Sequence, residues 1–190
     1  MSFYSDEELR QLGLGGVGRG VKLSRRASLH NAARITLGDH SRVDDFCVLS
    51  AGAGGIAIGR HVHVAVFCGL LGQGRIELGD YGGLSSRVTI YSSSDDYSGE
   101  FMSNPTVPGE FTRVESAPVR LGRHVIVGAG SVILPGCTLH EGSGVGALSL
   151  IRSDCEAFCM YFGSPARRIG RRSARMIELG GRLEAQAVRT

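Results

Sequence analysis

A short phrase, made of an aliphatic residue, a glycine, a charged residue and a ring-bearing residue, recurs along the chain. Its copies are Leu37-Gly38-Asp39-His40, Ile58-Gly59-Arg60-His61, Leu78-Gly79-Asp80-Tyr81 and Leu121-Gly122-Arg123-His124, with Leu139-His140-Glu141-Gly142 as a looser copy. After each copy the aliphatic position returns every six residues, as in Leu37, Val43 and Leu49. A period of six fits neither one face of an α-helix nor long strands of strict alternation.

Each six-residue unit can form one short strand with its aliphatic side chain pointing inward. A turn then follows, in which glycine or aspartate accepts an unusual backbone conformation. Three units enclose one coil of a triangular prism, and the copies that begin at Leu37, Ile58 and Leu78 are about one coil apart. A weaker coil opens near Val17. The pattern predicts an all-β fold, a parallel β-helix of about six coils.

The rest of the chain is expected to cover the prism and to interrupt it once. A capping-box pattern at Ser5 to Glu8 predicts a helical cap within residues 1–16, the β-helix is expected over 17–170, and a C-terminal helix is expected over 171–190. Residues 92–118 leave the repeat as a polar extended loop with three prolines. Long excursions of this kind are usually functional.

Composition excludes several classes of protein. Charged residues make up 21% of the chain and the net charge is only +3, which gives no electrostatic basis for binding nucleic acid. Neither a signal peptide nor an apolar run of membrane-spanning length is present, so we expect no membrane insertion and a cytoplasmic protein. The five cysteines form no CxxC pair and are interpreted as small buried hydrophobes.

The most specific stretch of the sequence runs from Leu121 to Arg167, where LGRHVIVGAGSVILPGCTLHEGSGVGALSLI leads into FGSPARRI. The ending is similar to a G-x-P-A-[KR] signature. Together with the repeats, it resembles the hexapeptide-repeat acyltransferase superfamily, in the branch of galactoside and maltose O-acetyltransferases and of lipopolysaccharide and capsule sugar acetyltransferases. The resemblance implies a left-handed β-helix, a homotrimer with active sites between subunits, a sugar or nucleotide-sugar acceptor, and acetyl-CoA as co-substrate.

The same resemblance implies a donor site along the C-terminal coils. The pantetheine arm of coenzyme A is expected to contact the backbone near Ala129 and Ala147, and its phosphates to meet Arg152 and Arg167. A guanidinium suits a phosphate because it stays charged and can bond to it bidentately. Ordinary surface arginines are the alternative for both residues.

The general base departs from the family pattern. Asp95 stands where the resemblance places a histidine, in Val88-Thr89-Ile90-Tyr91-Ser92-Ser93-Ser94-Asp95. An ordinary carboxylate is a weak base at neutral pH, although crowding by Asp96 in a sheltered cleft would raise its pKa. His63 is the second candidate, as base, as acceptor-binding group or as a partner of Asp95, and a corner residue bonded to backbone is the alternative.

Four further residues are assigned to acceptor binding. The resemblance places Ala65 on the coil that lines the acceptor pocket, with Asp44 and Asp45 one coil below, and Asn104 lies in the extended loop. Carboxylates there can hold sugar hydroxyls, and hydrogen bonding within the corners is the alternative. An amine acceptor on an amino sugar needs only deprotonation of an ammonium group, so both O- and N-acylation stay open.

Two other functions share this scaffold. A zinc enzyme on the same prism needs three histidine ligands, and only His61 and His63 are close in sequence, so no metal is expected. The other rival is a non-catalytic trimer that keeps the scaffold as a binding or assembly protein. The departure at Asp95 favours this rival, and the intact signature at the donor end opposes it.

Overall fold

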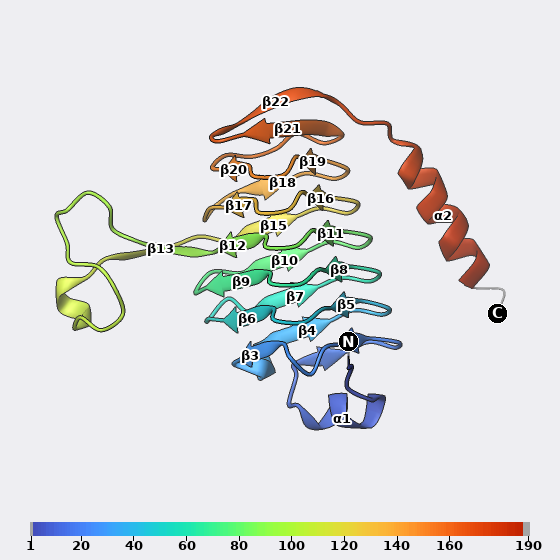
Figure 1. Ribbon diagram of the computed structural model, residues 1–190, viewed down its shortest axis with the longest axis horizontal. Coiled ribbons are helices and arrows are strands. Elements are labelled where there is room, and N and C mark those ends of the chain that lie inside the picture. Colours follow the sequence, from blue (N-terminus) through green and yellow to red (C-terminus); the bar gives the residue numbers. More distant parts are fainter. Residues whose placement is uncertain (1, 188–190) are drawn as a thin grey trace.

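The computed structural model describes residues 2–187 and shows a prism of short stacked strands with one helix near each end of the chain (Figure 1). Three sheets form the sides of the prism, and each coil contributes one strand to the first, second and third sheet in turn. The sheets are parallel apart from the last strand of the second one. This is the left-handed parallel β-helix that the sequence predicts.

The strands alternate strictly among the three sheets. The first sheet contains β1 (Gly16–Val17), β4 (Ile35–Leu37), β7 (Ile56–Ile58), β10 (Ile76–Leu78), β15 (Val119–Leu121) and β18 (Thr138–Leu139). The second contains β2 (Lys22–Leu23), β5 (Arg42–Val43), β8 (His63–Val64), β11 (Gly83–Leu84), β16 (Ile126–Val127), β19 (Gly144–Val145), β21 (Cys159–Gly163) and β22 (Ala166–Arg171). The third contains β3 (Ser28–His30), β6 (Val48–Ala51), β9 (Gly69–Gly72), β12 (Thr89–Tyr91), β17 (Val132–Ile133) and β20 (Leu150–Ile151). Six complete coils are therefore formed, and β21 belongs to a partial seventh.

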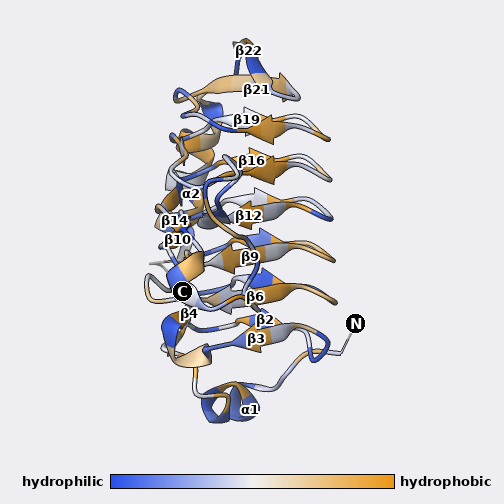
Figure 2. Ribbon diagram, turned by 90° about the vertical axis from the view of Figure 1, so that its left-hand side faces the viewer, coloured by the Kyte–Doolittle hydropathy of each residue, from blue (hydrophilic) through white to orange (hydrophobic). Residues whose placement is uncertain are grey.

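The repeated aliphatic positions build the core because the pairing register places them directly above one another. In the first sheet one such ladder runs through Leu37, Ile58, Leu78, Leu121 and Leu139. All five side chains are buried. Burial of one such side chain contributes roughly 1.5–3 kcal/mol, so stacking coils stabilises each strand that is too short to be stable alone. Figure 2 shows hydrophobic residues gathered in β16 and β19.

The turns between the first and second sheets carry the ring-bearing residues of the repeat. His40, His61, Tyr81 and His124 all have left-handed backbone conformations, with φ between 54° and 61°. Their rings stack in one column, with centroids 4.9, 5.3 and 4.9 Å apart. Left-handed backbone costs a non-glycine residue on the order of 1 kcal/mol, and the stacking offsets part of that cost. The glycine of the phrase is needed for close approach, since a Cβ on Gly38 would lie 2.5 Å from the carbonyl carbon of Gly59.

Helices lie near both ends of the chain. The helix α1 (Asp6–Gln11) begins with the expected capping box between Ser5 and Glu8 and buries Leu9. The helix α2 (Arg175–Ala187) begins later than the expected start at residue 171, because Arg171 still pairs with Cys159 in the antiparallel pair of β21 and β22. Residues 1 and 188–190 of the two expected caps lie outside the described residues.

Residues 92–118, which we call the arm, leave the prism between β12 and β15 (Figure 1). The arm starts and ends as an antiparallel pair, β13 (Ser93–Asp95) and β14 (Val114–Ser116), and contains a 3-10 turn at Gly109–Phe111. A second 3-10 turn spans Ala32–Arg34. Several large apolar side chains of the arm are exposed: Tyr97, Phe101, Met102, Phe111 and Val114. The arm therefore presents apolar surface that its own chain leaves uncovered.

Candidate active site

The turns between the second and third sheets form one continuous edge, which we call the second corner. Because the strands are in register, these turns stack in three rows that run along the prism. The first row is Asp44, Ala65, Ser85, Gly128 and Gly146; the second is Asp45, Val66, Ser86, Ala129 and Ala147; the third is Phe46, Phe67, Arg87, Gly130 and Leu148. The second corner thus collects five residues that the sequence assigns to the acceptor or the donor: Asp44, Asp45, Ala65, Ala129 and Ala147.

His63 lies beside this edge, at the start of β8. Its Nε2 is 2.8 Å from Oδ2 of Asp44, and the other carboxylate oxygen of Asp44 accepts from Nε of Arg42 at 2.6 Å. Burial raises the pKa of Asp44, but the hydrogen bonds from Arg42 and His63 outweigh it and leave that pKa below its ordinary value. The carboxylate is buried and ionised while about half of the His63 side chain is exposed. When Nε2 of His63 donates to Asp44, Nδ1 is left as an acceptor.

Asp45 is held mainly inside its own corner. Its carboxylate accepts from the hydroxyl of Ser24 and lies 3.9 Å from a guanidinium nitrogen of Arg26. The hydrogen bonding within the corner that the sequence left open as an alternative is therefore present for Asp45, and the acceptor-binding role stays a prediction.

An aromatic ladder forms the N-terminal part of the third row. The rings of Phe46 and Phe67 stack with centroids 5.0 Å apart, and both side chains are nearly half exposed. The guanidinium of Arg26 lies 5.6 Å from the Phe46 ring, and that of Arg87 lies 5.2 Å from the Phe67 ring. This stack keeps two cations on the surface of the second corner, where an anionic group of a ligand can meet them.

Small residues occupy the C-terminal part of the corner. Gly128 and Gly146 continue the first row, and a Cβ on Gly128 would lie 2.4 Å from the backbone nitrogen of Ala147. Ala129 and Ala147 are exposed. Small exposed side chains leave the backbone within reach of an extended ligand such as a pantetheine arm, so this end fits the predicted donor site.

Ser85 and Ser86 were missed by sequence reasoning. They stand in the first and second rows, between the residues predicted for the acceptor and those predicted for the donor, and both are only partly exposed. The carbonyl of Ser86 accepts from the backbone nitrogen of Gly130, and the carbonyl of Ser85 accepts from the thiol of Cys68. The repeat could have located them, because each lies a fixed distance after a repeated leucine, Leu84.

Asp95 lies outside the second corner, at the base of the arm. It lines a cavity of about 450 Å³ together with residues of β12, the arm and the loop after β17: Tyr91, Ser93, Ser94, Tyr97, Leu134 and Pro135. Among residues 2–187, no side chain bonds to its carboxylate, which is partly buried. Asp95 follows the third sheet, whereas His63 belongs to the second sheet, so one chain does not place them in a single corner.

Asp96 and Asn104 form turns within the arm. The carboxylate of Asp96 accepts from Ser98 and from the backbone nitrogen of Gly99, and these hydrogen bonds, that from the Ser98 side chain being the strongest, lower its pKa. The Asp96 carboxylate is therefore held in a turn of the arm, and its crowding with Asp95, which the sequence left open, stays a prediction. The side-chain oxygen of Asn104 accepts twice from Thr106, and its role at the acceptor stays a prediction.

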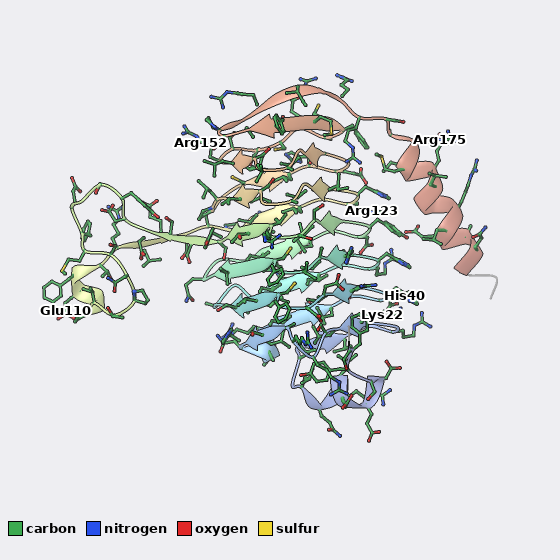
Figure 3. The ribbon with its side chains drawn as sticks, in the orientation of Figure 1. Lys22, His40, Glu110, Arg123, Arg152 and Arg175 are labelled. Carbon is green, nitrogen blue, oxygen red and sulfur yellow. The ribbon has the colours of Figure 1, made fainter. Side chains whose placement is uncertain are left out.

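The two predicted phosphate-binding arginines are exposed at the C-terminal end of the prism. Arg152 follows β20, on the side of the prism away from Arg123 and α2 (Figure 3), and Arg167 lies in β22. The only bond made by the Arg167 guanidinium within the described part of the chain is to the neighbouring carbonyl of Ala166. Arg168, by contrast, pairs with Glu156.

The described residues contain neither a metal site nor a membrane-spanning helix. In residues 2–187 no three His, Cys, Asp or Glu side chains come together as a metal site. None of the helices in that range is both long and apolar enough to cross a bilayer.

A left-handed prism of hexapeptide coils with a protruding arm and an edge of this composition defines the class of hexapeptide-repeat acyltransferases. No protein-family model matches the sequence. The dTDP-4-amino-4,6-dideoxy-D-glucose acyltransferase of Escherichia coli is 45% identical over 188 residues, which cover 99% of this chain and 98% of that protein. WbbJ of Escherichia coli K12, a putative lipopolysaccharide biosynthesis O-acetyl transferase, is 28% identical over 147 residues, 75% of this chain and 71% of that protein.

A solved structure agrees with these relatives. AntD, an N-acyltransferase from Bacillus cereus in complex with dTDP and 3-hydroxybutyryl-CoA, is 36% identical, with a TM-score of 0.94 and coverage of 100% of this chain and 99% of AntD. AntD has also been solved with one serine replaced by Cys, Ala or Thr, and with one aspartate, ten residues later, replaced by Asn or Ala. The chain belongs to the acyl-CoA-dependent sugar acyltransferases of the hexapeptide-repeat superfamily.

Proposed function

We propose that this protein transfers a short acyl group from acyl-CoA to the 4-amino group of a dTDP-linked 4-amino-4,6-dideoxy sugar. The observation that carries the proposal is the second corner, where an acceptor end with His63 and Asp44 runs without interruption into a donor end of small residues. The similarity to the Escherichia coli enzyme over nearly the whole of both chains supports the same acceptor.

The donor is acetyl-CoA, extended along Ala129 and Ala147 with its phosphates near Arg167. Arg152 follows the third sheet, as Asp95 does, and is therefore assigned to the phosphates of a coenzyme A bound by a neighbouring subunit. Arg167 has no acidic partner among residues 2–187, so its guanidinium is free to bond a phosphate. The reaction takes place in the cytoplasm, where coenzyme A thioesters are formed.

Transfer requires one bond to form and one to break. The neutral amine attacks the thioester carbonyl carbon, the tetrahedral intermediate expels coenzyme A as its thiolate, and the proton lost by the amine ends on that thiolate. A base beside the nitrogen accepts the proton in between. The Ser85 hydroxyl, at the middle of the corner, is suited to donate a hydrogen bond to the oxygen on which negative charge develops.

Asp95 is our choice for the base. A serine and an aspartate ten residues apart were chosen for replacement in AntD, and Ser85 with Asp95 have that separation here, as do Ser86 with Asp96. The second pair is disfavoured because Asp96 is engaged by Ser98 and Gly99, whereas the described residues leave the Asp95 carboxylate unbonded.

A homotrimer reconciles the two halves of the site. The second corner lies between the second and third sheets, whereas Asp95 follows the third sheet of the same chain. The arm of a neighbouring subunit is therefore needed to bring Asp95 to Ser85. Exposed apolar residues of the arm, such as Tyr97 and Met102, then gain cover on the neighbour.

The test is formation of the amide from acetyl-CoA and dTDP-4-amino-4,6-dideoxyglucose, followed by mass spectrometry of the sugar. Asp95→Asn is expected to lower kcat at least about tenfold, as for a proton-transfer group, and Asp96→Asn is the matched control expected to retain most activity. If Asp96→Asn loses activity and Asp95→Asn retains it, the base is Asp96 instead. Acetyl-CoA binding with no product from any amino or hydroxyl sugar would favour the non-catalytic alternative.

A further inference from the structure

The third row of the second corner has one gap. Phe46, Phe67 and Arg87 carry large side chains, and the next position is Gly130, which has none. The gap adjoins Ser86, since the backbone nitrogen of Gly130 donates to the Ser86 carbonyl at 3.0 Å. The side-chain-free position therefore lies one step from the pair of serines at the middle of the corner.

Leu148, one coil further along, leans over this gap. A Cβ placed on Gly130 would lie 2.8 Å from Cδ2 of Leu148, so the leucine side chain occupies the space that the glycine leaves. Leu148 is nevertheless 76% exposed and has a left-handed backbone with φ of 56°. Every residue of the third row shares this left-handed conformation, so it belongs to the repeat, and it is the exposure of a large apolar side chain that points to a role at a site.

The position of Leu148 relative to the donor suggests that role. Its backbone nitrogen donates to the carbonyl of Ala129, in the row where the pantetheine arm is proposed to lie. The thioester carbonyl must lie at Ser85, and an acyl chain that extends from it toward the third row enters the gap over Gly130. An acetyl group needs little of this space, whereas a longer chain competes with the Leu148 side chain for it.

We infer that Leu148, lying over Gly130, restricts the acyl group that the enzyme accepts and makes acetyl-CoA a better donor than butyryl-CoA. This inference rests on the proposed function. One or two methylenes in an apolar pocket change kcat/KM by roughly 10- to 200-fold. Truncation of Leu148 should therefore open the gap to the longer chain without touching the groups that move the proton.

The experiment compares kcat/KM for acetyl-CoA and butyryl-CoA with one acceptor, in wild type, Leu148→Ala and Leu179→Ala. Leu179 is a similarly exposed leucine on α2 and serves as the control. We expect the wild type to prefer acetyl-CoA at least about tenfold, Leu148→Ala to reduce that preference at least about tenfold, and the control to match wild type. An equal preference in wild type and Leu148→Ala, or a wild-type preference for butyryl-CoA, would overturn the inference.

Two further measurements separate the possible causes of failure. Light scattering reports whether Leu148→Ala changes the oligomeric state. If the oligomeric state changes, Leu148→Val provides a smaller truncation. An unchanged donor preference in Leu148→Val then counts against the inference. Calorimetric Kd values for the two acyl-CoAs test the same ratio without turnover. A wild type that forms no product with either donor overturns the proposed function, while the Kd ratio still decides the role of Leu148.

Discussion

The Nε2 atom of His63 and the Oδ2 atom of Asp44 are 2.8 Å apart across two adjacent coils. The carboxylate is buried and the imidazole is half exposed, so the pair connects the interior of the corner with its surface. Asp44 fixes which ring nitrogen of His63 carries the proton, and it is itself held by Arg42. This relationship leads to two predictions, one about stability and one about the acceptor.

Asp44→Asn should destabilise the protein by about 1–3 kcal/mol at pH 7, because two hydrogen bonds to a buried charge are weakened. Urea denaturation measures the change. Glu115→Gln, at an exposed pair with Arg113 3.8 Å away, is the control and should change the free energy of unfolding by less than about 1 kcal/mol. Since the pKa of Asp44 is lowered in the folded state, its contribution is present above pH about 4 and is lost as the pH falls further. Equal decreases in the free energy of unfolding of Asp44→Asn and Glu115→Gln would show that the buried carboxylate stabilises the protein no more than an exposed one.

His63→Ala should raise KM for the sugar acceptor at least about tenfold while kcat changes by less than about threefold, because we assign His63 to acceptor binding and proton transfer to Asp95. Steady-state kinetics with saturating acetyl-CoA give both constants. His30→Ala, which alters an exposed histidine of β3 on the third sheet, is the matched control. A fall in kcat with an unchanged KM would instead make His63 the base, with Asp44 as its orienting partner.

The coils were predictable because one local pattern decides both the strand and its neighbour. An aliphatic residue every six positions, as at Leu37 and Val43, fixes which side chains point inward, and stacking then fixes the register. The same register carries Asp44 beneath Ala65 and Ala129 beneath Ala147, so the stacking of these residues could be foreseen from the repeat, while their roles at the acceptor and the donor stay predictions.

Other features depend on forces that no local pattern reports. The arm has no repeat, so the turn that occupies the Asp96 carboxylate could not be read from its sequence. Arg171 continues β22 because of its pairing with Cys159, against a helical composition. Ser85 carries no chemical signature of its own and becomes a candidate only through its place between the two ends of the corner.

Cys137 and Cys155 should be inert toward alkylation in the folded protein. Both are buried, and burial raises the pKa of Cys137 to about 11 and that of Cys155 to about 12. Since the thiolate is the reactive form, we expect no rapid labelling of these two residues by iodoacetamide at pH 8 and labelling of both after denaturation. Mass spectrometry of the labelled protein counts the modified residues. Rapid labelling of either Cys137 or Cys155 without loss of structure would contradict the burial of the C-terminal coils.

His124 should make stability depend on pH. It is buried at the end of the stacked column, where Gly180 of α2 would place a Cβ 3.1 Å from its ring, and its Nε2 has no partner among the described residues. Burial, followed by the charge of Arg123, lowers its pKa, so the folded state holds the ring neutral while the unfolded state binds a proton below about pH 6.5. Stability is therefore expected to fall as the pH drops through that range.

A variant can separate this titration from the stacking itself. His124→Phe keeps a ring against Tyr81, and the left-handed turn accepts phenylalanine, as Phe46 and Phe67 have φ of 62° and 63° at the second corner. Urea denaturation at intervals from pH 8 to pH 5 should show a smaller loss of stability in this variant than in wild type, because the unfolded chain then has one proton fewer to bind. Parallel stability curves for the two proteins would show that protonation of His124 does not oppose folding.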